Sequence, residues 1–197
     1  MNHPTFNSGI DPDDLLEAYR NSFFPMADPR TGVISWYSPD PRAIVPLEGF
    51  RVPRSLRRII QKGIFSIRLD TAFRSVIEAC AEREQTWISR EIIVGYANLH
   101  KEGFAHSVES WMDGQLVGGL YGVSIGGAFF GESMFSRITN ASKVALVSLV
   151  EILRARRFRI LDTQFMNEHV RQFGAIEVSR SVYRAALADA LQEPTSF

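Results

Sequence analysis

Apolar residues recur along the chain at two spacings, one typical of helices and the other of strands. Three- and four-residue spacing predicts helices over residues 71–82, 91–102, 141 to about 156 and 181–191. Alternating or continuous apolar runs predict strands over residues 104–112, 115–125, 128–130 and 158–165. Asp113-Gly114 and Gly126-Gly127 supply the turns between the first three strands, and Gly174 ends a short helix over 167–173. Asn140 is expected to cap the helix that starts at 141. These elements together predict an α+β fold.

The first third of the chain has a different pattern. Asp11 at the N-cap, Pro12 and the acids that follow predict a helix to about Arg20. Proline and aromatic residues crowd residues 23–42, which excludes a long helix there and favours short strands and turns. Residues 43–46 and 66–69 are expected to be strands on either side of a basic helix. We therefore predict a small N-terminal lobe over residues 1–65 and a second domain over residues 66–197.

One carboxylate interrupts the apolar pattern of residues 118–137. Glu132 is surrounded by Phe129, Phe130, Met134 and Phe135. A carboxylate removed from water costs several kcal/mol unless it is paired, and such conflicts between pattern and chemistry concentrate at functional sites. The structural alternative is that Glu132 pairs with a nearby arginine such as Arg137, or caps the next helix.

Bulk composition places the chain among ordinary globular proteins. Of its 197 residues, 45% are hydrophobic and 22% are charged. The sequence has no apolar run long enough to span a membrane, and its start does not resemble a signal peptide. Cys80 is the single cysteine, which fits a reducing cytoplasm. The four histidines, His3, His100, His106 and His169, lack the spacing of a metal site.

Basic residues are unevenly distributed although the formal net charge is zero. Four of them, Arg54, Arg57, Arg58 and Lys62, recur at helical steps and share one helix face. A second basic cluster spans residues 154–159. A solvated helix face explains any one such cluster, whereas two clusters suit the phosphate backbone of a nucleic acid.

Seven short motifs occur in one order along the chain. They are Trp36-Tyr-Ser-Pro-Asp-Pro-Arg42, Thr86-Trp-Ile-Ser-Arg90, His106-Ser-Val-Glu-Ser-Trp111, Gly118-Gly-Leu-Tyr-Gly122, Gly131-Glu-Ser-Met-Phe-Ser-Arg137, Ala141-Ser-Lys143 and Leu161-Asp-Thr-Gln164. Together they resemble the bacterial leucyl/phenylalanyl-tRNA–protein transferase family over roughly Asp11 to Leu187.

This resemblance implies both a fold and an activity. The fold would be an acetyltransferase-like (GNAT-type) mixed sheet with flanking helices plus a small N-terminal lobe, which agrees with the predicted order of strands and helices. The activity would be transfer of Leu or Phe, with Met as a further candidate, from the acceptor end of aminoacyl-tRNA to proteins that begin with Arg or Lys. Such transfer marks those proteins for degradation. We expect a cytoplasmic monomer that needs no cofactor, metal or membrane.

Asp162 and Gln164 are the candidate catalytic residues. They stand two positions apart in an apolar strand, a spacing that places them on one face. Our hypothesis is that Asp162 orients Gln164 and that the pair holds or deprotonates the attacking amine. The alternative is a structural Asp–Gln pair that closes the strand.

The resemblance also implies a pocket for the aminoacyl side chain. Its candidate residues are Leu120, Phe129, Met134, Leu149, Leu153 and Leu161, each of which could equally be an ordinary core residue. Glu132 would read the cationic N-terminal side chain or shape this pocket. Trp87 first and Trp36 second are candidates to stack on the terminal adenosine. The basic residues Arg54, Arg57, Arg58 and Lys62 would hold the acceptor stem.

Some positions depart from the family pattern. Met26 stands where some members have a tryptophan that contacts adenosine, and Leu149 and Leu153 stand where others have phenylalanine. The chain also starts later than many members do.

Two other functions would account for part of the predicted fold or of the basic clusters. A CoA-dependent N-acetyltransferase would need a glycine-rich turn that residues 137–142 lack, and an RNA-binding module leaves Glu132, Asp162 and Gln164 unexplained.

Overall fold

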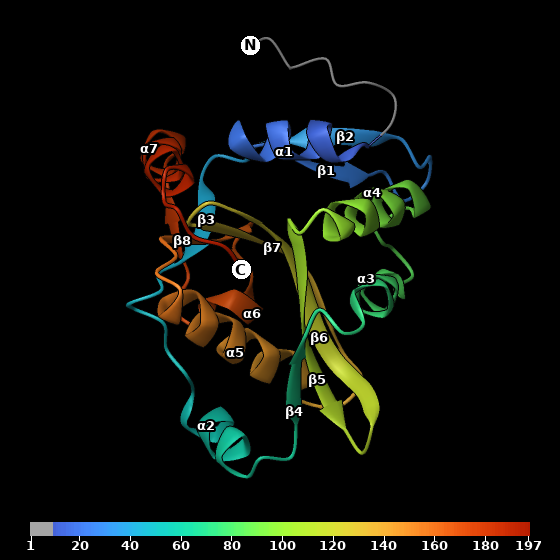
Figure 1. Ribbon diagram of the computed structural model, residues 1–197, viewed down its shortest axis with the longest axis vertical. Helices are drawn as coiled ribbons and strands as arrows, with labels where there is room; N and C mark the ends of the chain where they lie inside the picture. Colours follow the sequence, from blue (N-terminus) through green and yellow to red (C-terminus); the bar gives the residue numbers. More distant parts are fainter. Residues whose placement is uncertain (1–9) are drawn as a thin grey trace.

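A seven-stranded mixed sheet forms the centre of the protein, seen here in a computed structural model that describes residues 10–197 (Figure 1). The strand order is β4-β5-β6-β7-β8-β3-β9, and β7 with β8 is the parallel pair among antiparallel neighbours. The strands are β3 (Arg42–Val45), β4 (Ser66–Leu69), β5 (Ala105–Met112), β6 (Gln115–Ile125), β7 (Ala128–Ser136), β8 (Ile160–Gln164) and β9 (Ile176–Val178). The predicted α+β class with a mixed sheet is confirmed.

Helices cover both faces of this sheet (Figure 1). They are α1 (Pro12–Arg20), α2 (Arg54–Gln61), α3 (Phe73–Ala81), α4 (Arg90–Lys101), α5 (Ala141–Ala155), α6 (Glu168–Arg171) and α7 (Arg180–Leu191). α3 and α4 pack on one face and α5 on the other, and each side has its own apolar core. No helix within residues 10–197 combines the length and apolar character needed to cross a membrane.

The N-terminal region forms a small sheet of its own and also contributes one strand to the main sheet. β1 (Phe24–Ala27) and β2 (Ile34–Tyr37) form a separate two-stranded sheet beside α1. β3, by contrast, lies between β8 and β9 in the main sheet. Hydrogen bonds therefore link the predicted lobe of residues 1–65 to the domain that follows it. Residues 1–9 of that predicted lobe lie outside the described part.

Glycines in β6 allow α5 to start directly against the sheet. A Cβ atom on Gly118 would lie 2.5 Å from the Cβ of Ala141, the first residue of α5. Such a contact is too short for two carbon atoms, so a larger side chain at 118 would push the helix away. The glycine-rich run of β6 thus fixes the height at which α5 packs over the sheet.

Several predicted boundaries differ from the structure. β7 continues to Ser136, beyond the predicted end at residue 130, and the three-residue strand β9 was not predicted. Asn140 occupies the N-cap position of α5, but its side chain makes no capping hydrogen bond and its φ is +73°. The prediction that Asn140 caps this helix is therefore confirmed for its position but not for a side-chain bond, and the backbone turns there in a left-handed conformation that asparagine tolerates.

Candidate active site

A cavity of about 670 Å³ lies where β7 and β8 separate. The two strands pair from Ala128 with Ile160 to Phe130 with Asp162, and the pairing stops there. Beyond that point β7 supplies six consecutive lining residues, Gly131 to Ser136, and β8 supplies Leu161, Thr163 and Gln164. Further lining comes from β1, from the loop between α3 and α4, from α5 and from the segment after β8. The separation of two strands therefore creates this opening.

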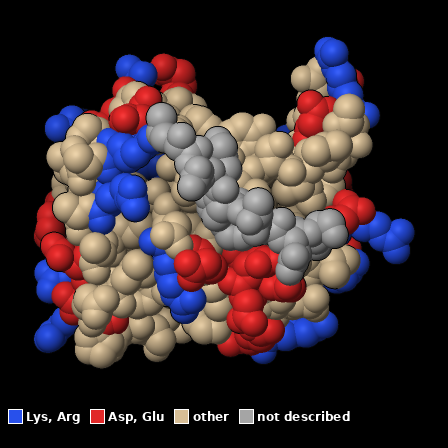
Figure 2. All heavy atoms as spheres, turned by 90° about the horizontal axis from the view of Figure 1, so that it is seen from above, with Lys and Arg blue, Asp and Glu red and all other residues tan. Residues whose placement is uncertain are grey.

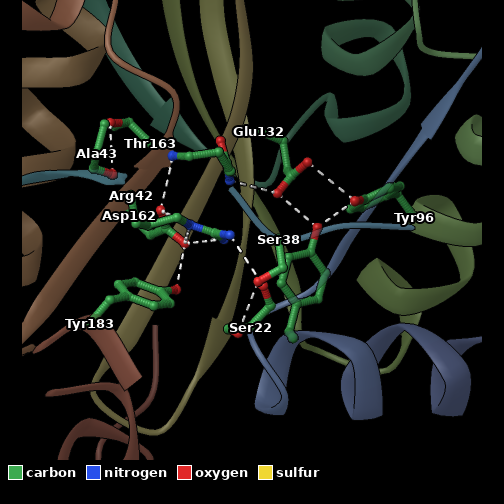
Figure 3. A network of polar contacts seen from close by, with 11 residues as sticks. Ser22, Ser38, Arg42, Ala43, Tyr96, Glu132, Asp162, Thr163 and Tyr183 are labelled. Carbon is green, nitrogen blue, oxygen red and sulfur yellow. Dashed lines mark hydrogen bonds and ion pairs between the residues drawn. The ribbon is translucent and has the colours of Figure 1, made fainter. Parts of the chain in front are cut away.

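Glu132 is a carboxylate in the lining of this cavity. Its Oε1 accepts hydrogen bonds from the Tyr19 hydroxyl at 2.7 Å and from Gln164 Nε2 at 3.2 Å. Its Oε2 accepts one from the Tyr96 hydroxyl at 3.2 Å (Figure 3). The two tyrosine hydroxyls also contact each other. The alternative that Glu132 pairs with Arg137 is wrong, because Arg137 instead reaches Glu82 at 3.3 Å.

Burial makes this carboxylate easier to protonate than an ordinary glutamate. Removal from water raises the pKa of Glu132 from 4.5 to about 7, and the nearby Asp162 charge raises it too. Hydrogen bonds from Tyr19 and Tyr96 and the charge of Arg42 act in the opposite direction. A carboxylate with a pKa near 7 can accept and release a proton at neutral pH.

Asp162 lies behind the cavity and is completely buried. Arg42 donates to it through Nε at 3.0 Å and through Nη2 at 2.6 Å, which forms a two-point ion pair. The Tyr183 hydroxyl donates to Oδ2 at 2.6 Å, and the Gln164 backbone N–H donates to Oδ1 at 2.9 Å. Figure 3 shows Arg42 and Tyr183 gathered around this carboxylate. Its acceptor positions are thus occupied by protein groups.

Gln164 owes its position to an irregularity in β8. The register with β3 shifts between Ala43 and Ile44, which pair with Gln164 and Asp162, so that Thr163 is an extra residue. Gln164 itself has a φ of +56°, in the left-handed region. Thr163 and Gln164 consequently both line the cavity whereas Asp162 does not. The expected sharing of one strand face by Asp162 and Gln164 is not met, because the bulge breaks the alternation.

The polar network carries an excess of negative charge. Among residues 10–197 it joins two carboxylates, Glu132 and Asp162, through Gln164, with Arg42 as the guanidinium beside them. When both carboxylates are ionised, one negative charge within this network is left uncompensated, which favours a cationic group such as a protonated amine beside Glu132. Farther along the lining, Glu82 is accompanied by the cations Arg83 and Arg137.

The predicted side-chain pocket is partly assembled in this cavity. Leu120, Met134, Leu149 and Leu161 line it together. Phe129 and Leu153 are fully buried and do not belong to the lining. They pack in the apolar core behind the cavity, where Phe129 contacts the ring of Phe197. Four of the six candidates therefore face the opening.

Of the two tryptophans predicted to stack on the terminal adenosine, one lines the cavity and the other does not. Trp87 lines the cavity from the loop between α3 and α4, and its carbonyl accepts a hydrogen bond from the Ala27 N–H at 3.0 Å. Met26 on β1 lines the same opening. Trp36 pairs with Pro25 across the small sheet and packs against the core, and it is not part of the lining.

The two basic clusters have different surroundings. Arg54, Arg57, Arg58 and Lys62 on and after α2 are all exposed. In the second cluster, Arg154 donates to the Leu47 carbonyl at 2.7 Å, Arg156 lies over the Phe197 ring and Arg159 pairs with Glu193. These three side chains are exposed but each already has a partner within the protein, and the expectation that this second cluster suits a phosphate backbone stays a prediction.

Acidic side chains are also present at the end of the molecule opposite to α2. α1 lies at the top of Figure 1 and α2 at the bottom. Figure 2, which looks onto the end with α1, shows acidic and basic groups next to each other on this face. Asp13 and Asp14 in the first turn of α1 belong to this end.

Four residues of the site were not predicted from the sequence, namely Arg42, Tyr19, Tyr96 and Tyr183. Arg42 ends the first of the seven motifs, a signal that could have marked it. The tyrosines carried no signal, since a single tyrosine on an apolar helix face is usually a core residue. Within residues 10–197 no three acidic, histidine or cysteine side chains form a group that could hold a metal ion, and His3 lies outside that range.

Comparison with known proteins identifies close relatives. Residues 44–188 match the family described as leucyl/phenylalanyl-tRNA protein transferase, and residues 9–40 match the N-terminal domain of that family. The chain is 54% identical to the leucyl/phenylalanyl-tRNA–protein transferase of Salinibacter ruber, covering 92% of this chain and 80% of the relative. It is likewise 54% identical to that of Gloeobacter violaceus, covering 95% and 97%.

Two solved structures show slight similarity to the chain. A ribosomal-protein-alanine N-acetyltransferase from Brucella melitensis biovar Abortus matches with 16% identity and a TM-score of 0.40, over 55% of this chain and 87% of that one. L-PGS from Bacillus licheniformis matches with 12% identity and a TM-score of 0.44, over 88% and 62%. Similarities of this size carry no conclusion about function.

Proposed function

Because the chain belongs to the leucyl/phenylalanyl-tRNA–protein transferase family, we propose that its reaction takes place in the cavity between β7 and β8. The enzyme transfers Leu or Phe from aminoacyl-tRNA to a protein. The observation that carries the proposal is the Glu132 carboxylate, which faces the cavity and is bonded to Gln164. The CoA-dependent alternative rests on fold-level similarity alone.

The chemistry requires positioning and the movement of one proton. The nitrogen of the acceptor's α-amino group attacks the ester carbonyl carbon of the aminoacyl-tRNA. An amide bond forms, the bond from that carbon to the ribose oxygen breaks, and the terminal hydroxyl of the tRNA leaves. The amine must first lose a proton, because an α-amino group has a pKa near 8 and is mostly protonated at neutral pH. A proton is then returned to the departing ribose oxygen.

Glu132 and Gln164 are the residues proposed to receive the amine. The excess negative charge around Glu132 attracts the ammonium form, and a pKa of about 7 suits this carboxylate to take up the proton. The Gln164 side chain lies beside it and offers an amide oxygen to the same amine. Asp162, the other catalytic candidate from the sequence, is bonded on all sides by protein groups. We therefore assign it the role of orienting Gln164 rather than of contacting substrate.

The apolar part of the cavity is proposed to hold the aminoacyl side chain. Leu120, Met134, Leu149 and Leu161 form a wall of unbranched and γ-branched side chains. The methionine and leucines of the wall can repack around a Leu, Met or Phe side chain of the substrate. A substrate side chain that branches at Cβ, such as Val or Ile, would be too wide for a narrow pocket entrance. Phe129 and Leu153 support this wall from the core.

The tRNA is proposed to bind at two places. Trp87 offers an aromatic face to the terminal adenosine, a contact worth about 1–3 kcal/mol per base. Met26 lines the same opening and would cover the opposite side without an aromatic ring. The exposed basic residues of α2, with Lys62, would hold the phosphates of the acceptor stem, while Trp36 remains a secondary candidate. Transfer should then weaken steeply as salt is added, because phosphate contacts release counterions.

The acceptor is proposed to be a cytoplasmic protein that begins with Arg or Lys, and the added residue marks it for degradation. The negative charge next to Glu132 favours a cationic acceptor. Glu82 at the cavity edge is a second acidic group there, already paired with Arg137 at 3.3 Å.

A transfer assay with matched peptides tests this function. The protein is incubated with Leu-tRNA and four peptides that differ in their first residue, which is Arg, Lys, Ala or Glu. We expect a one-residue mass gain for the Arg and Lys peptides, and none for an N-acetylated Arg peptide. Glu132→Gln serves as the matched variant and should lose the gain. A mass gain that requires acetyl-CoA would support the rival function, and equal gain for all four peptides would refute the proposed acceptor.

A further inference from the structure

The conformation of Gln164 is held by a buried network that no substrate can reach. Gln164 is a non-glycine residue at a φ of +56°, and such backbone positions persist when their surroundings fix them. Its N–H donates to Asp162 Oδ1 at 2.9 Å, across a single intervening residue. This bond closes the turn that brings the Gln164 side chain to the cavity.

Asp162 in turn is fixed by two residues from distant parts of the chain. Arg42 comes from β3 and Tyr183 from α7, and both lie outside the cavity lining. Arg42 also donates to the Ser22 carbonyl at 3.1 Å, and its guanidinium lies 4.8 Å from the centre of the Tyr183 ring. Arg42 is 1% exposed and Asp162 is not exposed. The carboxylate therefore has little freedom to rotate.

We propose that Arg42 and Tyr183 are positioning residues that act through Asp162 to hold Gln164 in its left-handed turn, with its amide against Glu132. This inference rests on the proposed role of Gln164 in the reaction. The C-terminal helix α7 then completes the active site, although it does not supply a residue to the cavity lining. Loss of one bond to Asp162 lets the carboxylate rotate and releases the turn, so that the Gln164 amide no longer meets the amine.

Tyr183→Phe is the most informative variant, because it removes one hydroxyl and keeps the ring against Arg42. A hydrogen bond to a charged group is worth enough to change a rate about tenfold. We expect kcat to fall by about that factor, with the KM for aminoacyl-tRNA and for the peptide unchanged within about twofold. Val182→Ala is the control, since Val182 precedes Tyr183 on α7 and its side chain is 56% exposed. It should leave both constants unchanged.

A double-mutant cycle separates positioning from a merely structural role. If Tyr183 acts through Gln164, adding Tyr183→Phe to Gln164→Ala should lower kcat no further. An equal tenfold loss in both backgrounds would overturn the inference, as would a raised KM with unchanged kcat. Arg42→Lys keeps the charge but loses the two-point geometry, and it should lower kcat as Tyr183→Phe does. Absence of transfer by the unmodified protein in this assay would instead contradict the proposed function.

Discussion

The two carboxylates of the site lie on neighbouring strands in opposite environments. Glu132 on β7 faces the cavity, accepts bonds from neutral groups and has a pKa raised to about 7. Asp162 on β8 is sealed from the cavity and bonded to a guanidinium. A buried carboxylate whose charge is compensated within the protein serves as support, whereas one without such a partner is available for reaction. Glu132 has no cationic group bonded to it, whereas Asp162 is bonded to the Arg42 guanidinium.

Replacing the compensated carboxylate should have the largest effect, and the effect should be on stability. Asp162→Asn leaves the buried Arg42 guanidinium without its counter-charge. Breaking a buried ion pair in this way costs about 3–5 kcal/mol of unfolding free energy. Urea unfolding followed by circular dichroism measures the loss. A loss of unfolding free energy below about 1 kcal/mol would contradict a stabilising role for the buried ion pair between Asp162 and Arg42.

Replacing the cavity carboxylate should affect the rate and leave the fold intact. Glu132→Gln keeps the size of the side chain and removes the group that takes up the proton. Proton transfer by a positioned side chain contributes about 10²–10⁴-fold to a rate, so single-turnover transfer should slow by a factor in that range. The free energy of unfolding at pH 7 should not decrease. Full activity in the folded variant would refute the assigned role of Glu132.

Glu132 could be singled out from the sequence, whereas the surroundings of Asp162 could not. The element order, the turns and the motif that contains Glu132 follow from local patterns, and the structure confirms most of them. Asp162 and Gln164 were chosen as a pair, yet the bond between them runs through the Gln164 backbone N–H because of an extra residue in β8. A bulge depends on how two distant strands align, and the partners Arg42 and Tyr183 lie 120 and 21 residues from Asp162. Such contacts leave no periodic signal in the sequence.

The free energy of unfolding should depend on pH through the Glu132 carboxylate. The pKa of Glu132 is raised in the folded protein, so between about pH 4.5 and 7 the folded state binds more protons than the unfolded chain. Glu132 therefore destabilises the fold increasingly as the pH rises through this window. The unfolding free energy of the unmodified protein should fall relative to Glu132→Gln over the same range. A difference that does not change with pH would contradict the raised pKa.

The smallest expected effect comes from the tyrosine that tunes Glu132. The Tyr96 hydroxyl donates to Oε2 at 3.2 Å and lowers the pKa of the carboxylate, against the larger effect of burial. Tyr96→Phe removes that donor, so the pKa should rise. The single-turnover rate should increase with pH up to a plateau, because only the ionised carboxylate accepts a proton, and in Tyr96→Phe the midpoint of this increase should move to higher pH. Adding Glu132→Gln should abolish the inflection in both backgrounds. A midpoint that stays in place would mean that Glu132 does not set the pH profile, and a midpoint that moves to lower pH would mean that Tyr96 favours the protonated carboxyl.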